Sequence, residues 1–314
     1  MSFTYWLPDE KGQKKEYKAN SNAVIIIGAN GSGKSKLGAW IEQQNYDSVH
    51  RIGAQRNLNF SENIALKRYS QAEDLVFYGN DEPDGIYKLQ KGSRWGWGEK
   101  RQFTTSLLDD FDNILAALLA LRNNENEEYI RRCREAERSE NEKPNTPITV
   151  VEKLKEIWRS VLPHRQLVED DSKFYAVFEN DGVETKYSAT QMSDGERAVL
   201  YLTAQVLCVP QDKILIIDEP EIHLHPSWQL IFAEIIVLLH KEFDLHILIN
   251  THSPYFFRAI EVYVKKYEVQ DKCDFYLSTS NGDIAEFANV NENIEKIYKK
   301  LWQPFQRLEN EEQD

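Results

Sequence analysis

The sequence predicts an α/β protein with a mixed sheet, an N-terminal antiparallel β portion and a short helical insertion. Two observations lead to this fold class. Residues 23–27, 214–217 and 247–249 are short, unbroken apolar runs, which is typical of strands buried on both faces of a parallel sheet. Segments with helical spacing follow these runs, and such alternation favours parallel strands joined through helices.

The composition indicates a globular protein with a substantial core. The chain has 314 residues, of which 41% are hydrophobic, enough for one large domain or two modest ones. No apolar run approaches the roughly 20 residues that cross a bilayer, and the N-terminus lacks the layout of a signal peptide. The three cysteines fit no metal-ligand pattern. We expect a cytoplasmic protein with reduced thiols and no membrane association.

The net charge of −13 disfavours a broad surface for nucleic acid, because phosphate contacts need concentrated lysine and arginine. Two local segments leave nucleic-acid binding open. Residues 91–101 interleave basic side chains with Trp95 and Trp97, a composition able to stack on bases; the alternative is a loop that packs its own tryptophans onto the domain. Residues 131–138 carry arginines among glutamates, and their alternative is a solvated helix surface.

The N-terminal elements follow from local patterns. Alternation at Phe3, Tyr5 and Leu7 predicts a strand that pairs with a second strand near Tyr17. The apolar run that ends at Gly28 predicts a buried strand. Helical spacing over residues 34–44 and a further short strand over residues 48–54 come next.

Residues 80–165 differ in character from their surroundings. Glycine-rich, charged stretches at first indicate loops. Residues 106–123 then show strong helical periodicity, which continues to about residue 140, and residues 149–162 form another amphipathic helix after a proline-containing break. We assign residues 80–165 to a helical insertion in an α/β domain made of residues 1–80 and 165–314.

The remaining elements complete the α/β pattern. A hairpin over residues 173–187 is predicted with its turn at Asn180-Asp181-Gly182, and a helix begins after Ser193. Buried strands end near residues 218 and 251, separated by a helix that Pro226 opens. A last hairpin has its turn at Asn281-Gly282.

A phosphate-binding loop is predicted at residues 28–35, which match G-x-x-x-x-G-K-[ST] between a strand and a helix. Glycines let backbone N–H groups turn around a phosphate, and the helix N-terminus adds partial positive charge. Lys34 would reach the β- and γ-phosphates of ATP, and the Ser35 hydroxyl would bind Mg²⁺. The alternative is a merely structural glycine-rich turn. The candidate nucleotide contacts are Gly28, Asn30, Gly31, Ser32, Gly33, Lys34 and Ser35.

An acidic pair, Asp218 and Glu219, follows the apolar run 214–217. The carboxyl ends of buried strands are where ligands lie in such sheets. Asp218 would hold Mg²⁺ directly or through water, and Glu219 would position and polarise the attacking water. The alternative is that the pair only caps the next helix. Capping does not explain why the pair occurs in the same chain as a phosphate-binding loop.

A third motif, Ser193-Asp194-Gly195-Glu196, has the spacing of a capping box. In this arrangement Ser193 and Glu196 bond the first N–H groups of the following helix. Gly195 leaves backbone amides open to a close anion. Capping boxes are common, so the motif alone favours a structural role.

Together and in this order, the three motifs resemble those of the ABC-type ATPases. The resemblance implies that nucleotide lies between two subunits, with the helix start at Ser193, Gly195 and Glu196 of one subunit aimed at the γ-phosphate held by the other. Many members have L-S-G-G-Q or L-S-G-G-E, and this chain departs from them at Asp194.

Two further positions take their roles from the same resemblance. His252 matches the switch histidine that contacts the γ-phosphate. Gln55 is the best match to the glutamine that senses Mg²⁺ and water, with Gln71 as the alternative. The implied catalytic residues are thus Lys34, Glu219 and His252, and the implied metal-site residues are Ser35, Asp218 and Gln55.

The stretch 218–228, Asp-Glu-Pro-Glu-Ile-His-Leu-His-Pro-Ser-Trp, resembles the OLD-like and RecF-like branch, which is related to SMC ATPases rather than to transporters. Glu221, His223 and His225 leave a metal site open, but an alternating pattern on one extended segment supplies no closed ligand set. A loop that contacts the second subunit is the favoured interpretation.

The resemblance implies a Mg²⁺-dependent ATP hydrolase that forms a homodimer or a higher even homo-oligomer around ATP. OLD-family nucleases carry a C-terminal nuclease domain, whereas residues 253–314 contain no clear nuclease carboxylate cluster. We therefore expect a separate effector, a nuclease, as in two-gene antiphage systems of the Septu, PARIS or retron-associated type. The alternative is a RecF-like repair ATPase that binds DNA in its ATP-bound dimer.

Overall fold

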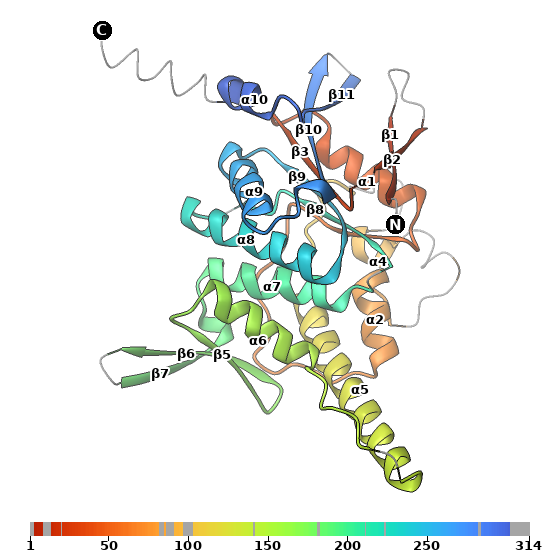
Figure 1. The fold of residues 1–314 in the computed structure, drawn as a ribbon, viewed down its shortest axis with the longest axis vertical. Coiled ribbons are helices and arrows are strands. Elements are labelled where there is room, and N and C mark those ends of the chain that lie inside the picture. Colours follow the sequence, from red (N-terminus) through yellow and green to blue (C-terminus); the bar gives the residue numbers. More distant parts are fainter. Residues whose placement is uncertain are drawn as a thin grey trace. The chain divides into compact units, whose positions relative to one another are not determined.

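A computed structural model describes residues 3–8, 14–19, 21–81, 85, 91–96, 103–140, 142–180, 183–210, 212–222, 224–281 and 284–301. The chain divides into two compact units. The first unit combines Met1–Ala54 with Gln211–Asp314, and the second is Gln55–Pro210. Figure 1 labels most elements of both units.

The first unit contains a mixed sheet whose described strands lie in the order β11 (Ile284–Asn289), β10 (Cys273–Asn281), β3 (Ala23–Gly28), β9 (His246–Thr251), β8 (Ile214–Asp218) and β4 (Val49–Ile52). All neighbours pair in parallel except β10 and β11, which are antiparallel. A separate antiparallel pair is formed by β1 (Phe3–Pro8) and β2 (Lys14–Ala19). The predicted α/β class, with its mixed sheet and N-terminal antiparallel portion, is confirmed.

Helices cover both faces of this sheet, as right-handed crossovers require. The connection from β3 to β4 runs through α1 (Lys34–Gln44), while β8, β9 and β10 are joined in the opposite direction through α8 (Pro226–Phe243) and α9 (Pro254–Lys266). Helix α1 therefore lies on one face, and α8 and α9 lie on the other. A short helix, α10 (Ile294–Leu301), follows β11.

The core beneath α1 has the period-two pattern of the strands. The buried residues of this cluster are Val24, Ile26, Leu37, Ile41, Val49, Ile216, Leu248 and Tyr276. All six residues of β3 are buried, because its alternate side chains face α1 and the opposite helical layer. On that opposite side, the ring centroids of Phe257 and Phe275 lie 5.4 Å apart.

The second unit is mainly helical. Its helices are α2 (Tyr69–Tyr78), α4 (Gly92–Trp95), α5 (Phe111–Arg138), α6 (Val150–Val161) and α7 (Asp194–Cys208), and its antiparallel sheet consists of β5 (Gln166–Asp170), β6 (Lys173–Asn180) and β7 (Val183–Ser188). The N-terminal part of α5, from Phe111 to Ala120, is largely buried, which agrees with its apolar periodicity. A capping box at Thr149 starts α6.

This unit is larger than the insertion predicted at residues 80–165. It also takes in α2, the sheet β5–β7 and α7, because these elements pack with α5 and α6. The predicted boundaries of the helical insertion, at residues 80 and 165, stay a prediction. The two predicted hairpin turns stay predictions, because residues 181–182 of the first turn and residue 282 of the second lie outside the described residues.

No helix in the described ranges combines the length and the apolar character needed to cross a bilayer.

Candidate active site

The loop between β3 and α1 has the features of an anion cradle. Gly33, the residue before α1, has φ 91° and no side-chain cap, and the first turn of the helix contains no acidic residue. The first N–H groups of α1 are therefore left for another acceptor. Gly31 has φ 82° with open space beside its Cα. Only glycine takes up these backbone angles without strain.

The strands beside the loop hold it closely. A Cβ atom on Gly28 would lie 2.5 Å from the carbonyl oxygen of Ser278, and one on Gly33 would lie 2.8 Å from Cβ of Ala285. The hydroxyl of Ser278 donates a 2.8 Å hydrogen bond to the carbonyl oxygen of Ser32. Strands β10 and β11 thus fix the loop from the side.

Lys34 lies inside the loop. Its Nζ donates hydrogen bonds of 2.8 and 2.9 Å to the carbonyl oxygens of Gly28 and Ala29, and the residue is only 3% exposed. Burial lowers the pKa of Lys34, although the charges of Glu219, Glu221 and Asp218 oppose this shift. A phosphate would offer the ammonium group stronger acceptors than these carbonyls.

Asp218 ends β8 on the α1 face of the sheet. Its Oδ1 accepts a 2.6 Å hydrogen bond from Nδ2 of Asn250, and its Oδ2 accepts one of 2.9 Å from Nη1 of Arg51. Burial raises the pKa of Asp218, and Arg51 and Asn250 oppose that effect. Gly38 on α1 permits this close packing, since a Cβ there would lie 3.0 Å from Oδ1 of Asp218.

Glu219 adopts an uncommon backbone conformation. Its φ is 45°, a region that side chains other than glycine, asparagine and aspartate seldom occupy, and its N–H donates a 2.7 Å hydrogen bond to the carbonyl of Asn250. Strain of this kind gathers at functional sites. The turn brings the carboxylate towards the loop after β9, where Oε1 lies 3.6 Å from Nδ1 of His252.

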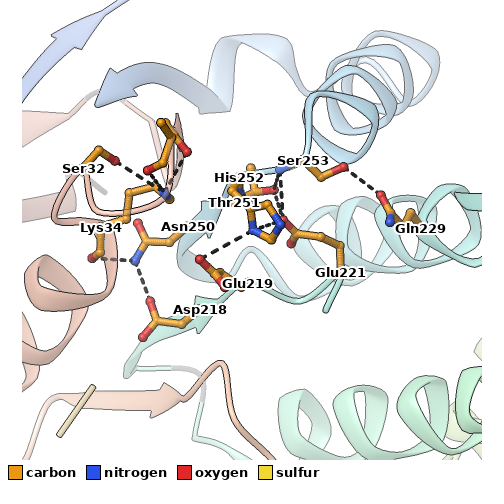
Figure 2. A network of polar contacts seen from close by, with 12 residues as sticks. Ser32, Lys34, Asp218, Glu219, Glu221, Gln229, Asn250, Thr251, His252 and Ser253 are labelled. Atoms are coloured by element: carbon orange, nitrogen blue, oxygen red, sulfur yellow. Dashed lines mark hydrogen bonds and ion pairs between the residues drawn. The ribbon is translucent and has the colours of Figure 1, made fainter. Parts of the chain in front are cut away.

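His252 lies between two carboxylates. Its Nδ1 is 3.4 Å from Oε1 of Glu221 as well as 3.6 Å from Oε1 of Glu219 (Figure 2). The contact with Glu219 raises the pKa of His252; burial and Lys34 oppose the shift, and the charge of Glu221 supports it. Lys34, Asp218, Glu219 and His252 therefore come together in the first unit.

Sequence reasoning missed two participants in this cluster. Asn250 bridges Asp218 and the carbonyl oxygen of Lys34, the latter at 3.2 Å. The sequence favours for Glu221 a place in a loop that contacts the second subunit and leaves a metal site open, yet Glu221 accepts hydrogen bonds from Thr251, His252 and Ser253 at the end of β9. The available signal for Asn250 was its position at the end of an apolar strand, two residues before His252.

The metal alternative at residues 221–225 finds no support. His223 lies outside the described residues, and Nδ1 of His225 accepts a hydrogen bond from the N–H of Ser227, capping α8. Within the described part of the chain, no group of three or more histidine, cysteine, aspartate or glutamate side chains is arranged to hold a metal ion.

The Ser193 motif forms a complete capping box at the start of α7. Oγ of Ser193 accepts from the N–H of Glu196 at 3.4 Å, and Oε2 of Glu196 accepts from the N–H of Ser193 at 2.9 Å. Glu196 is 1% exposed and also bonds Arg165 and Tyr187. Burial alone would raise the pKa of Glu196, but the hydrogen bonds from Ser193, Arg165 and Tyr187 lower it overall.

Only part of the Ser193 motif is exposed to solvent. Ser193 and Asp194 are exposed, whereas Gly195 and Glu196 are buried. The nucleotide contacts assigned to Ser193, Gly195 and Glu196 stay predictions. So does the metal-sensing role of Gln55, an exposed residue at the start of the second unit, and that of Gln71 in α2.

In the basic segments considered for nucleic acid, Arg94, Trp95 and Arg131 make internal contacts or are buried. Arg94 forms a buried ion pair with Asp110, and Trp95 is 1% exposed, as the alternative of a self-packed loop requires. Arg131 is exposed but lies within 3 Å of both Glu128 and Glu135, as on a solvated helix surface. Trp97, Lys100 and Arg101 lie outside the described residues.

The residues present suit a bound Mg²⁺ through water rather than direct contact with Asp218. Both Asp218 oxygens already accept hydrogen bonds, but Oδ1 of Asn250, buried beside them, has no hydrogen-bond partner among the described residues. A buried acceptor of this kind suits a metal-bound water. Ser35, in the first turn of α1, is partly exposed.

The strand, the glycine loop and the acidic pair define a P-loop ATPase domain. Residues 92–258 match the family described as "AAA domain, putative AbiEii toxin, Type IV TA system", which is 167 of 314 residues. The chain belongs to this family. The match takes in the Ser193 motif, the acidic pair and His252, and the loop at residues 28–35 lies before it.

One individual relative is also similar over a short stretch. The "Retron Ec83 probable ATPase" of Escherichia coli is 38% identical over 80 residues, which span 21% of this chain and only 14% of that relative. The predicted resemblance to an ABC-type P-loop ATPase related to those of defence systems is confirmed.

Two solved structures are similar at low identity. The SMC head domain from Thermotoga maritima is 13% identical with a TM-score of 0.42, covering 91% of this chain and 97% of that one. The ADP conformation of the ATP-binding cassette of an ABC transporter is 14% identical with a TM-score of 0.42, covering 97% and 96%.

Proposed function

We propose that this chain is a Mg²⁺-dependent ATPase that dimerises around ATP and regulates a separate effector nuclease in antiphage defence. The single observation that carries the catalytic part is the meeting of Lys34, Glu219 and His252 beside a glycine loop with uncapped N–H groups. A structural turn needs neither the strained Glu219 nor a histidine that contacts its carboxylate.

The residues divide the work of phosphoryl transfer among them. The loop amides and Lys34 hold the β- and γ-phosphates of ATP and stabilise the negative charge that develops on them. Glu219 orients the attacking water and accepts its proton. His252 contacts the γ-phosphate from the opposite loop. Ser35, and Asp218 through water, would hold Mg²⁺, which would supply charge neutralisation at the phosphate oxygens.

Dimerisation is inferred from the exposed end of α7. Ser193 and Asp194 face solvent in the described chain, so a second copy can reach them. Backbone N–H groups at this helix start favour an anion such as a γ-phosphate. In the proposed dimer, ATP bridges two chains only while the γ-phosphate is present, and its hydrolysis changes their arrangement.

The effector role rests on family membership and on the retron relative. A chain that switches between two arrangements can restrain or release a toxic partner. Co-expression with the neighbouring gene product, followed by affinity purification with and without ATP, tests this role. We expect co-purification that depends on nucleotide, and a partner that never binds would contradict it.

Multiple-turnover ATP hydrolysis tests the catalytic part. We expect phosphate release in Mg²⁺ that falls by roughly 100-fold or more in Glu219→Gln, because the general base is lost, with nucleotide affinity retained. The matched control is Glu234→Gln, a helix carboxylate of the same unit bonded to Lys266, which should hydrolyse ATP normally. Equal turnover in all three proteins would contradict the assignment.

A further inference from the structure

Glu221 is a buried carboxylate with an unusual set of partners. Its residue exposure is 3%, and it lies in the loop after β8, two residues beyond Glu219. A buried carboxylate is costly unless hydrogen bonds compensate for lost solvation. Its partners therefore indicate what the residue organises.

A single oxygen of Glu221 accepts hydrogen bonds from three consecutive residues, the last residue of β9 and the two that follow it. Oε1 accepts from the hydroxyl of Thr251, from the N–H of His252 at 3.0 Å and from the N–H of Ser253 at 3.1 Å. The same oxygen lies 3.4 Å from Nδ1 of His252. The histidine backbone is thus hydrogen-bonded to this oxygen, and its ring nitrogen lies at ion-pair distance from the same oxygen (Figure 2).

Helix capping does not account for this arrangement. Ser253 already caps α9, since its Oγ accepts from the N–H of Phe256 at 3.2 Å, and its hydroxyl donates to Oε1 of Gln229 at 2.8 Å. The start of α9 is therefore satisfied without Glu221. The contacts of the carboxylate instead surround His252, through the hydroxyl of Thr251, the N–H groups of His252 and Ser253, and the His252 ring.

Packing alone does not fix the His252 ring either. Its side chain is 37% exposed and borders a cavity of about 400 Å³ that Glu221, Leu224 and Gln229 also line. A ring beside such a space can turn unless polar contacts hold it. With Nδ1 directed at the two carboxylates, Nε2 is the ring nitrogen left for a ligand.

We propose that Glu221 is a positioning residue that holds His252 in the orientation needed to contact the γ-phosphate. The inference rests on the proposed ATPase function, whose switch histidine it concerns. Glu219 acts on the water, while Glu221 acts through His252 and touches neither water nor nucleotide.

The test compares Glu221→Gln and Glu221→Ala with Thr251→Val in the full chain. Glu221→Gln keeps an oxygen acceptor but loses the charge, and Glu221→Ala loses both. Thr251→Val removes only the hydroxyl that donates a hydrogen bond to Glu221. We expect kcat to fall on the order of 10- to 100-fold in Glu221→Ala, as for other groups that orient a reacting residue. A smaller fall is expected in Glu221→Gln, and near-normal kcat in Thr251→Val.

Two further readouts separate positioning from simple loss of structure. ATP affinity, measured by calorimetry with a non-hydrolysable analogue and Mg²⁺, should change by less than about threefold, because Lys34 and the loop are untouched. The imidazole ¹⁵N signals of His252, assigned by their loss in His252→Gln, should shift in Glu221→Gln and Glu221→Ala and stay in place in Thr251→Val.

The outcomes are distinguishable. Normal kcat with unshifted His252 signals in folded Glu221→Ala would overturn the inference, and if that variant does not fold, the same result in Glu221→Gln would do so. Absence of ATP turnover in the unmodified protein would instead refute the proposed function, and the imidazole signals would still decide whether Glu221 holds His252.

Discussion

Nη1 of Arg51 lies 2.9 Å from Oδ2 of Asp218, and both side chains are only 1% exposed. The same guanidinium places Nε 3.0 Å from Oε2 of Glu42 on α1. A buried cation thus links the strand that ends at the candidate metal residue with the helix that begins at the phosphate-binding loop. Any change in this ion pair should act on both stability and nucleotide binding.

Replacement of Arg51 by methionine should strongly destabilise the first unit. It leaves two carboxylates buried without their cation, which typically costs about 3–5 kcal/mol. Urea unfolding of wild type and Arg51→Met measures the difference in the free energy of unfolding. The exposed Arg131→Met serves as the control and should show no measurable change. Equal stability of the two variants would contradict a structural role for the buried pair.

Replacement of Lys34 by alanine should weaken ATP binding. Hydrogen bonds to charged groups contribute about 1.5–3 kcal/mol each, so we expect a loss of roughly 10- to 100-fold in affinity. Titration with a fluorescent ATP analogue measures it. Lys36 lies two residues further along α1 and is exposed, and Lys36→Ala should bind normally. Similar losses in both variants would point to general charge attraction instead of a loop contact.

The two capping boxes offer a test of what Ser193 does beyond capping. Ser193→Ala and Thr149→Ala each remove a cap with the same geometry, and each should lower stability by about 1 kcal/mol. Only Ser193→Ala should also weaken ATP-dependent assembly. Stability from chemical denaturation and mass from light scattering are measured on both. Identical behaviour of the two variants in both assays would leave Ser193 a purely structural residue.

The pH dependence of stability should differ between two histidines. The pKa of His252 is raised by Glu219 and Glu221, so its contribution is fully present below about pH 6.5 and is lost as pH rises through the folded-state pKa. Burial lowers the pKa of His240, so its contribution is lost as pH falls through the folded-state pKa.

Unfolding free energies of wild type, His252→Gln and His240→Gln, measured from about pH 5 to pH 8.5, test these opposite signs. The stability advantage of wild type over His252→Gln should shrink towards high pH, and that over His240→Gln should shrink towards low pH. A wild-type advantage at His252 that grows with pH would contradict the placement of its ring between two carboxylates.

Much of the fold was predictable because the strands of the first unit are buried on both faces. The run 23–27 has no polar residue, and a glycine loop follows it, so strand, loop and helix could be predicted in order. The capping box at Ser193 was likewise visible as a local pattern. Its hydrogen bonds join residues only three positions apart, and local spacing is what a single sequence records best.

Long-range polar contacts could not be predicted in the same way. Arg51 and Asp218 are separated by 167 positions, and Glu221 and Thr251 by 30. An arginine in a strand ordinarily indicates an exposed position, and only the register of β4 against β8 places Arg51 beside buried carboxylates. The roles of Asn250 and Glu221 depend on the same kind of pairing between distant segments.

The molecular mass of the Glu219→Gln protein, with and without ATP and Mg²⁺, tests the central claim most directly. Loss of the general base should trap bound ATP, so we predict that nucleotide converts the single chain into a dimer or a higher even assembly. The further variant Ser193→Ala should prevent this conversion. A protein that binds ATP tightly yet keeps the mass of one chain would contradict the proposal that nucleotide joins two copies.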